Sequence, residues 1–301
     1  MELVTVVMPT YKDKGSLRRA VLSVLDQTYR DVELIVVDDN DPQSEFRKKT
    51  EVVMDEFKDN PKVTYLKHEV NKNGAAARNT GIKASHGSYI AFLDDDDWFL
   101  KEKIEKQVAY LGQHQEYAAV YNYALREGNQ IPTIPYEGDN SKPLLLMQTK
   151  MYTPSLCFRA EALKAINGFD ESFRRHQDYE MLIRFFAAGY RIGCLKEYLT
   201  GLCINQGENI PNPAKMMELK QYFFEKFDTI IRDLSKNDVT FKNRVYAKHY
   251  GAVEWDAIKT KNFKLAIKLF FRYFFLSPNY FTVTTRENLK SYIKRCCKQF
   301  S

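Results

Sequence analysis

The sequence predicts an α/β fold in which a Rossmann-like sheet carries helices on both faces and a C-terminal helical appendage follows it. Three observations support this prediction. Short β-rich runs alternate with amphipathic helical stretches over the first hundred residues, acidic residues come directly after two expected strands, and the pattern is helical from about residue 213 onward. We expect one domain over 1–212 and a basic, aromatic-rich helical region over 213–301.

The first hundred residues predict the parallel part of the sheet. Apolar residues from Leu17 to Leu25 have the spacing of an amphipathic helix, and Ser16 precedes them in a position to cap it. Strands that alternate with helices form right-handed crossovers and a parallel sheet covered on both faces. The expected strands are 4–9, 32–37, 62–67 and 88–93, and the expected helices are 17–25, 44–57 and 73–84.

Beyond residue 100 the alternation is looser. The first domain therefore divides into two halves, about 1–100 and about 101–212. In the second half we expect strands over 117–124 and 153–159, loops over 128–150, a turn at 168–171 and a helix over 177–188.

Composition and charge describe a globular chain with an uneven distribution of charge. Apolar residues make up 44% and charged residues 28% of the 301 residues, which is ordinary for a protein that buries a full core. Residues 241–301 hold 13 Lys and Arg against 3 Asp and Glu, whereas 1–240 hold 32 basic and 36 acidic residues. A mildly acidic body therefore precedes a strongly basic tail.

The cysteines and the N-terminus bear on the compartment. The five cysteines form no CxxC pair and have no histidine at metal-site spacing, so we expect no structural zinc. An odd count without a disulfide framework fits a reducing, cytoplasmic compartment. The N-terminus shows no basic leader, and the longest charge-free run near the C-terminus, 273–285, is too short to span a bilayer.

The stretch AFLDDDDW at 91–98 places four carboxylates directly after an apolar strand. Adjacent like charges repel, and each raises the pKa of its neighbours. A solvated acidic surface is one interpretation. We favour a site for a hard divalent cation such as Mg²⁺ or Mn²⁺, because the strand fixes the carboxylates and such cations share oxygen ligands with phosphates.

Three further polar clusters have both structural and functional interpretations. DDND at 38–41 is either a turn or a source of carboxylates for a nucleoside, and it should share an edge of the sheet with 94–97. NKNGAAARNTG at 71–81 is either a tightly packed loop and helix or a phosphate site at a helix N-terminus with Arg78. RRHQD at 174–178 is either a charged first turn or the second half of a site.

Together these motifs resemble the family 2 inverting glycosyltransferases of the GT-A fold. The resemblance covers about residues 3–200 and is specific because all the motifs occur in the family's order. It implies that 1–100 is a nucleotide-binding half and 101–212 an acceptor half. The matching stretches are VVMPTY at 6–11, LRRAVLSVLDQTY at 17–29, LIVVDDN at 34–40, NGAAARNTGI at 73–82, YIAFLDDDDW at 89–98 and NGFDESFRRHQDYEMLIRF at 167–185.

The resemblance also implies roles for individual residues. Asp178 would be the catalytic base, and Asp96 and Asp94 would hold Mn²⁺ or Mg²⁺ in a DxD element. The chain departs from the family at Gln177, where glutamate is frequent, and at Cys203-Ile204-Asn205, where an Arg-x-His element is frequent. The residues expected around the nucleotide and its phosphates are Pro9, Thr10, Tyr11, Asp39, Arg78, Asp94, Asp95, Arg175 and His176.

The implied reaction is the transfer of a sugar, expected to be a hexose, from a nucleotide-diphosphate sugar to a hydroxyl with inversion. The resemblance favours UDP as the nucleotide, and a glycan or a lipid-diphosphate-linked acceptor in bacterial O-antigen or capsule synthesis. Two other classes remain open. A sugar-nucleotidyltransferase should have a glycine-rich loop where PTYKDKGS has one glycine, and a non-catalytic nucleotide- or carbohydrate-binding protein would need no base.

The tail allows two interpretations. FKLAIKLFFRYFFLSPNYF at 263–281 mixes cations with aromatic residues. The region 263–301 either packs on the rest of the chain or makes peripheral contact with the inner face of the cell membrane. We expect no nucleic-acid binding, because no recognition motif accompanies the charge. The sequence leaves the oligomeric state open.

Overall fold

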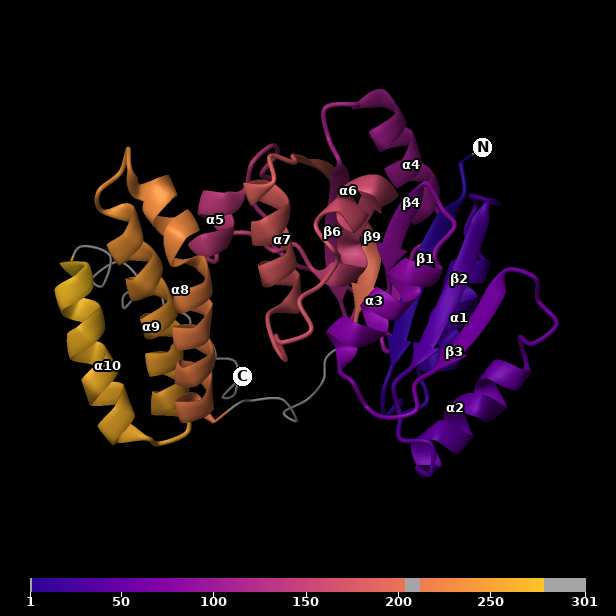
Figure 1. The fold of residues 1–301 in the computed structure, drawn as a ribbon, viewed down its shortest axis with the longest axis horizontal. Coiled ribbons are helices and arrows are strands. Elements are labelled where there is room, and N and C mark those ends of the chain that lie inside the picture. The colour runs from indigo at the N-terminus through magenta and orange to yellow at the C-terminus, as the bar shows by residue number, and fades with distance from the viewer. Residues whose placement is uncertain (1, 204–211, 279–301) are drawn as a thin grey trace. The chain divides into compact units, whose positions relative to one another are not determined.

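The structure, a computed structural model, describes residues 2–203 and 212–278 (Figure 1). The chain divides into two compact units. The N-terminal unit is Met1–Leu144 with Gln148–Asn205, and the C-terminal unit is Leu145–Met147 with Gln206–Ser301.

The strands are β1 (Val4–Thr10), β2 (Val32–Asp38), β3 (Val63–Lys67), β4 (Tyr89–Phe92), β5 (Trp98–Phe99), β6 (Ala119–Arg126), β7 (Asn129–Gln130), β8 (Leu156–Arg159) and β9 (Ile192–Leu202). The helices are α1 (Leu17–Leu25), α2 (Glu45–Asp55), α3 (Gly74–Ala84), α4 (Lys103–Gln113), α5 (Ser141–Leu145), α6 (Ala160–Ala165), α7 (Gln177–Ala187), α8 (Pro213–Ser235), α9 (Phe241–Lys259) and α10 (Phe263–Leu276), with a 3-10 turn η1 at Thr153–Ser155.

One sheet forms the centre of the N-terminal unit, with strand order β3-β2-β1-β4-β8-β6-β9-β5 and β7 paired to β6. The first four strands of the chain are parallel, which confirms the prediction for the first hundred residues. In the second half β8 runs antiparallel to β4 and β6, and β5 runs antiparallel to β9. The sheet as a whole is therefore mixed.

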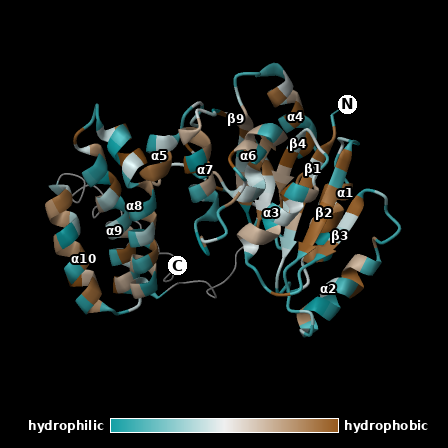
Figure 2. Ribbon diagram, in the orientation of Figure 1, coloured by the Kyte–Doolittle hydropathy of each residue, from teal (hydrophilic) through white to brown (hydrophobic). Residues whose placement is uncertain are grey.

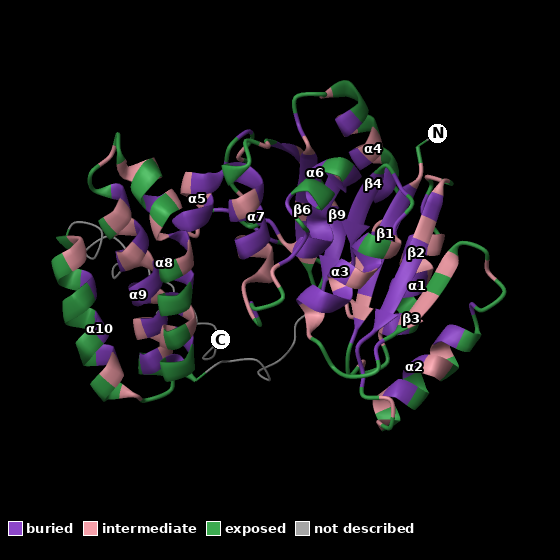
Figure 3. Ribbon diagram, viewed as in Figure 1, coloured by how far each residue is buried: buried purple, intermediate pink, exposed green. Residues whose placement is uncertain are grey.

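Helices cover both faces of the sheet because alternate side chains of each strand point in opposite directions. Val4, Val6 and Met8 of β1 share one core with residues of α1, α2 and α4. On the other face α3 lies so close to β1 that a Cβ atom at Gly81 would be 2.3 Å from Cγ1 of Val7. Figure 2 shows the apolar colouring of β1 and β2, and Figure 3 shows that these strands are buried.

Several local features differ from the sequence expectations, and one of them is that the stretch 128–150, expected to be loops, contains β7 and α5. Neither α4 nor β9 was expected, and β9 was missed because its centre is exposed and interrupts the apolar pattern of its ends. The strand expected at 153–159 begins only at Leu156, since η1 with Pro154 precedes it. The capping role of Ser16 is wrong: its side chain makes no cap bond, and Asp13 Oδ1 accepts from the N–H of Leu17 at 3.1 Å.

The described residues of the C-terminal unit form α8, α9 and α10, as the helical pattern predicts, and α9 packs against both other helices. Aromatic rings fill the contact of α8 with α9, where the ring centroids of Phe224 and Tyr246 are 3.9 Å apart. His249 Nε2 donates to the carbonyl oxygen of Leu145 at 2.9 Å, which attaches 145–147 to this unit. Among the helices that the structure describes, none has the length and apolar character needed to cross a membrane.

Candidate active site

The two acidic clusters lie at one edge of the sheet, beyond the carboxyl ends of β1, β2 and β4. β1 stands between the other two strands. Past its end, the N–H of Asp39 donates to the carbonyl oxygen of Thr10 at 2.9 Å, and the N–H of Tyr11 donates to Asp95 Oδ2 at 3.3 Å. The shared edge predicted from the parallel strands is confirmed.

Arg78 of α3 connects the four consecutive aspartates 94–97, the aspartate run, to the start of α7. Its Nη2 donates to Asp94 Oδ1 at 2.5 Å, and its Nη1 donates to Gln177 Oε1 at 2.9 Å. The guanidinium is largely buried and lies 5.5 Å from the ring centroid of Phe169. Asp94 and Gln177, about eighty residues apart in the chain, therefore both accept hydrogen bonds from the guanidinium of Arg78.

The far end of the aspartate run is fixed by β9 and α1. Asp97 is buried, and its Oδ1 accepts from the N–H of Cys203 at 2.8 Å. Arg19 of α1 donates to the carbonyl oxygen of Asp96. The far end of the run is thus held through the backbone of Asp96 and the side chain of Asp97.

Burial and mutual repulsion raise the pKa of two aspartates in the run. Burial, followed by the charges of Asp96, Asp13 and Asp94, raises the pKa of Asp95 to about 7. Burial, with the charges of Asp94 and Asp96, raises the pKa of Asp97 to about 8. A cation among these carboxylates would relieve the repulsion.

The aspartate run fits a hard divalent cation that has further ligands from another molecule. Over the described ranges, no group of three or more histidine, cysteine, aspartate and glutamate side chains is arranged to hold a metal ion. Mg²⁺ in proteins commonly takes one or two carboxylates and completes its shell with substrate phosphates and water. The carboxylate oxygens of the run are hard donors of the kind that such a cation takes.

Asp178 lies in the first turn of α7, next to Gln177. Burial raises its pKa above the ordinary aspartate value, and the charge of Asp94 raises it further, while the N–H of Tyr179 and the charge of Arg78 lower it. Asp178 therefore shares the electrostatic environment of Arg78 and the aspartate run. A raised pKa makes an ionised carboxylate a stronger proton acceptor.

Tyrosine side chains adjoin Asp178. Burial raises the pKa of Tyr179 and of Tyr152, and the charge of Asp178 raises the pKa of both phenols further. Arg126 at the end of β6 is hydrogen-bonded to Tyr152. Asp178 thus interacts with two tyrosine side chains as well as with Arg78.

Asp39 is buried, and its carboxylate organises the loop before α3. Oδ1 accepts from the N–H of Lys72 at 2.8 Å and lies 2.7 Å from Nδ1 of His68. Oδ2 accepts from Nδ2 of Asn71 and from the N–H of Asn73, both at 2.9 Å. The hydrogen bonds of Asp39 therefore fix the loop from which α3 begins, and α3 carries Arg78.

Asp38 has a structural role in the fold. It is fully buried and forms an ion pair with Arg47 at 3.0 Å. The hydroxyl of Tyr65 also donates to it at 2.5 Å. Asp38 therefore anchors the end of β2, and Asp39, the next residue, belongs to the edge where the site lies.

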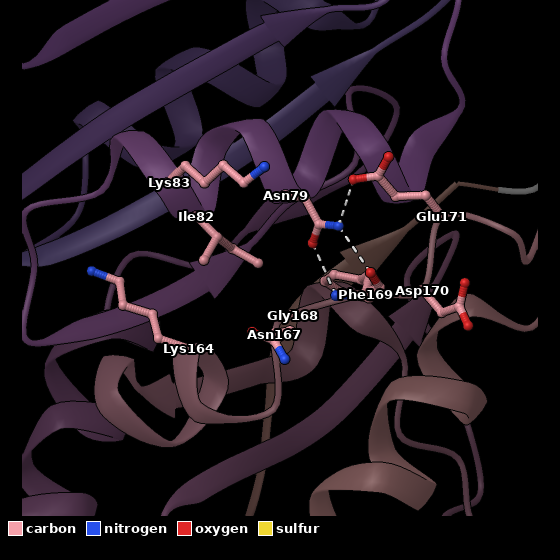
Figure 4. A pocket seen from close by; sticks show the side chains of 9 residues that line it. All are labelled: Asn79, Ile82, Lys83, Lys164, Asn167, Gly168, Phe169, Asp170 and Glu171. Atoms are coloured by element: carbon pink, nitrogen blue, oxygen red, sulfur yellow. Dashed lines mark hydrogen bonds between the residues drawn. The ribbon is translucent and has the colours of Figure 1, made fainter.

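Asn79 clamps the turn at residues 168–171 to α3 (Figure 4). Its Nδ2 donates to the carbonyl oxygen of Phe169 at 2.8 Å and to Glu171 Oε1 at 2.9 Å, and its Oδ1 accepts from the N–H of Phe169 at 2.9 Å. Gly168 has φ +60°, and a Cβ atom there would be 2.5 Å from Asn79 Oδ1. Arg184 of α7 donates to the carbonyl oxygen of Gly168 at 2.6 Å. The turn therefore fixes α3 relative to α7.

A cavity of about 670 Å³ surrounds this clamp, and Figure 4 shows the side chains that line it. Lys83 of α3 and Lys164 of α6 lie at its sides. No residue of the aspartate run lines it. It is a separate hollow from the edge where the carboxylates gather.

The remaining predicted residues flank the same edge. At the end of β1 Pro9 is half-buried, Thr10 is buried and Tyr11 is exposed. Arg175 and His176 are half-buried in the segment that leads into α7. Cys203 is the one described residue at the position expected for Arg-x-His, since Ile204 and Asn205 lie outside the described residues.

Sequence reasoning missed Arg19 and Gly201, which contact the aspartate run and Trp98, the residue that follows it. Arg19 contacts both the backbone of the run and the ring of Trp98, 4.6 Å from the ring centroid. A Cβ atom at Gly201 would be 2.0 Å from the indole, so Trp98 packs directly on the backbone of β9. These contacts depend on the pairing of β5 with β9, for which the sequence offers no periodic signal.

Comparisons with known proteins bear on the family and the fold of the chain. The family model for glycosyl transferase family 2 matches residues 5–172. The amylovoran biosynthesis glycosyltransferase AmsB of Erwinia amylovora is 25% identical over 303 residues, which cover 97% of this chain and 94% of AmsB. WfaP of Escherichia coli, a UDP-Glc:alpha-D-GlcNAc-diphosphoundecaprenol beta-1,3-glucosyltransferase, is 32% identical over 127 residues, or 42% of this chain and 48% of WfaP.

The fold resembles that of residues 1–349 of S. aureus TarS in complex with UDP-GlcNAc, with a TM-score of 0.68 and 16% sequence identity over 91% of this chain and 81% of TarS. At that identity the likeness concerns the fold alone, and it confirms the predicted α/β architecture with C-terminal helices. The family model covers more than half of the chain. The chain belongs to glycosyl transferase family 2.

Proposed function

We propose that this glycosyltransferase moves a hexose from a UDP-sugar to a hydroxyl of a glycan or a lipid-diphosphate-linked glycan, with inversion at the anomeric carbon. The observation that carries the proposal is the position of Arg78, which pairs with Asp94 and with Gln177 beside Asp178. It supports one site that combines phosphate binding with a base. The TarS complex with UDP-GlcNAc supports the donor class, and the activity named for WfaP supports the acceptor class.

In the proposed reaction the acceptor hydroxyl attacks the anomeric carbon while the bond from that carbon to the diphosphate oxygen breaks on the opposite face. Asp178 takes the proton of the hydroxyl, a step worth on the order of 10²–10⁴-fold in rate. Arg78 donates to the leaving diphosphate as its negative charge increases. This single displacement needs one base and forms no covalent intermediate with the protein, so it inverts the configuration.

We propose that Asp96 and Asp94 hold Mn²⁺ or Mg²⁺ together with the donor diphosphate. When bound, the ion supplies positive charge that stabilises the leaving group. In the same proposal Asp95 contributes to the donor site, and Arg175 and His176 lie near the phosphates. Pro9, Thr10, Tyr11 and Asp39 surround the nucleoside.

We further propose that the enzyme works in the cytoplasm at the inner face of the membrane, in the synthesis of a surface polysaccharide such as O-antigen or capsule. The polysaccharide pathway named for AmsB and the undecaprenol-linked acceptor named for WfaP support this placement. A lipid-diphosphate acceptor is presented at the membrane surface, so the enzyme must reach that surface.

The test is a panel of nucleotide-sugars with Mn²⁺, in which release of the nucleoside diphosphate is measured with and without lipid-diphosphate-sugar acceptors. We expect turnover of one UDP-sugar, stimulation by one acceptor and a product with inverted anomeric configuration by NMR. Loss of turnover after chelation and recovery with Mn²⁺ are expected as well. A product of retained configuration would refute the single displacement.

The same panel, extended by an assay with UTP and a sugar 1-phosphate, separates the two rival classes. A sugar-nucleotidyltransferase would form UDP-sugar and pyrophosphate from UTP and a sugar 1-phosphate. A non-catalytic protein would bind a donor without hydrolysis or transfer under any condition. Either result would overturn the proposed reaction.

A further inference from the structure

The apolar side chains of α10 divide between a buried face and an outward face. Ala266, Leu269 and Tyr273 are buried and hold the helix to the C-terminal unit. Phe263, Ile267, Phe271 and Phe275 are instead 60%, 59%, 54% and 75% exposed. Figure 3 shows most of the surface of α10 in the colour of exposed residues. The helix therefore carries a second apolar surface that the described fold does not cover.

The four outward residues form a continuous ridge. They follow one another at intervals of four, and residues i and i+4 are neighbours on one face of a helix. From Phe263 to Phe275 the ridge extends about 18 Å along the axis. Single exposed apolar residues are ordinary on protein surfaces, but contiguous apolar patches mark interaction sites.

A row of cations runs beside the ridge. Lys264, Lys268 and Arg272 follow Phe263, Ile267 and Phe271 by one position each, and all three are exposed. Arg272 lies 4.5 Å from the ring centroid of Tyr250. α10 contains no acidic residue.

We infer that the ridge of α10, with Lys264 and Lys268 beside it, binds the surface of an anionic lipid bilayer with the helix axis in the membrane plane. Aromatic and aliphatic side chains enter the boundary between headgroups and acyl chains, while lysines beside them meet anionic headgroups. With fourteen residues, three of them cationic, α10 is too short and too charged to span a bilayer.

Charge favours lipid over a second copy of this chain as the occupant. Two copies joined ridge to ridge would bring their lysine rows together without acidic partners on α10, whereas an anionic membrane neutralises them. This inference rests on the proposed function in one respect: a lipid-linked acceptor is the reason why the enzyme would need to contact a membrane. Vesicle binding is measured without donor or acceptor, so it can fail or succeed independently of the proposed reaction.

The experiment measures co-sedimentation of the full chain with vesicles of phosphatidylcholine alone and of phosphatidylcholine with phosphatidylglycerol. We expect binding to the anionic vesicles that weakens as salt is added. The double substitution Phe271→Ser and Phe275→Ser should reduce the partition coefficient roughly tenfold or more. Lys264→Gln with Lys268→Gln should abolish the preference for phosphatidylglycerol.

Val239→Ser is the matched control, because Val239 is 87% exposed in the same unit but lies outside α10, and it should bind like the unchanged chain. All variants should keep the same thermal midpoint, since the substituted side chains are exposed. Absence of binding to both vesicles, or equal binding after the double phenylalanine substitution, would overturn the inference. A dimer in light scattering that the same substitutions dissociate would assign the ridge to self-association instead.

Discussion

At the residue scale, Asp178 and the carboxylates of the aspartate run differ in their surroundings. Asp178 interacts electrostatically with Tyr179, Tyr152 and Arg78, whereas Asp95 and Asp97 interact chiefly with other carboxylates. The first environment suits a single base that exchanges a proton. The second suits a group of ligands for a cation.

Replacing Asp178 by asparagine preserves the shape of the side chain but removes its capacity to accept a proton. We expect transfer to fall by at least about 10²-fold, while the affinity for UDP stays nearly unchanged. Turnover assays and calorimetric titration of UDP measure the two quantities. Asp59→Asn is a matched control, because Asp59 is exposed and precedes β3 at the opposite edge of the sheet. Full activity of Asp178→Asn would eliminate this residue as the base.

The raised pKa of Asp178 predicts the acid limb of the rate profile. The base acts only when ionised, so transfer is present above its pKa and is lost as the pH falls through that value. Because burial raises this pKa, the limb should lie above the ordinary aspartate value of about 3.9. The quantity to measure is kcat at saturating donor, because protonation of Asp95 or Asp97 should change mainly the KM for the donor. A limb at or below pH 4 would contradict the assignment.

Asp96→Ala should weaken donor binding that depends on metal. The affinity for UDP in the presence of Mn²⁺ should fall toward the affinity that the unchanged chain shows with chelator, because a carboxylate ligand is lost. With chelator present, the variant and the unchanged chain should bind alike. Unchanged enhancement by Mn²⁺ in the variant would exclude Asp96 as a ligand.

At the element scale, the relation of α3 to α7 determines where Arg78 and Asp178 stand. The two helices are joined directly by Arg78 and Gln177 and indirectly by the turn that Asn79 clamps. Catalytic groups on separate elements need such fixed connections, because a misplacement of about 1 Å can cost 10²-fold in rate.

Asn79→Asp tests this clamp. The carboxylate has nearly the same shape but cannot donate to Phe169 or Glu171, and it adds a charge beside Glu171. We expect kcat to fall between roughly ten- and a hundredfold with little change in donor KM. Adding Glu171→Gln restores a donor to the pair and should recover part of kcat. If kcat and the thermal midpoint fell together without this recovery, the clamp would serve stability alone.

The strands β1, β2 and β4 were predictable as short apolar runs because they are buried on both faces, and α1 was predictable from its amphipathic period. β9 was not predictable, since Lys196 and Glu197 at its centre are exposed and interrupt the pattern. The same difference applies to the site. The aspartate run and Arg78 are visible as motifs, but Arg19 and Gly201 act through contacts that only the pairing of distant strands creates.

At the scale of the whole molecule, the division into two units does not follow one boundary in the chain. The sequence suggests a boundary near residue 212, yet Leu145–Met147 belong to the C-terminal unit. Leu145 is buried, and its carbonyl oxygen accepts a hydrogen bond from His249. Stability of the C-terminal unit should therefore depend on a residue far before it in the chain.

Leu144→Ala and Leu145→Ala form a matched pair, because the two leucines are adjacent, both buried and assigned to different units. Each should cost about 2–5 kcal/mol in the unit that buries it. The two tryptophans report separately, Trp98 on the N-terminal unit and Trp255 on the C-terminal unit. Leu145→Ala should shift the denaturation midpoint seen by Trp255, and Leu144→Ala the one seen by Trp98. Equal shifts of both signals would show that the units unfold together.

The pairing of β5 with β9 has a consequence for the order in which the site forms during synthesis. β1, β2, β3 and β4 pair with one another within the first 92 residues, so these strands can associate early. Among the described strands, β5 pairs only with β9, at Thr200 and Gly201, and Asp97 bonds to Cys203 directly after β9. At ordinary rates of synthesis, about 5–20 residues per second, the far end of the aspartate run lacks its contact with Cys203 for several seconds after it emerges, whereas its contact with Arg19 of α1 can form at once. A nascent chain shorter than about 200 residues should therefore hold β1 to β4 with an aspartate run that is not yet joined to the end of β9.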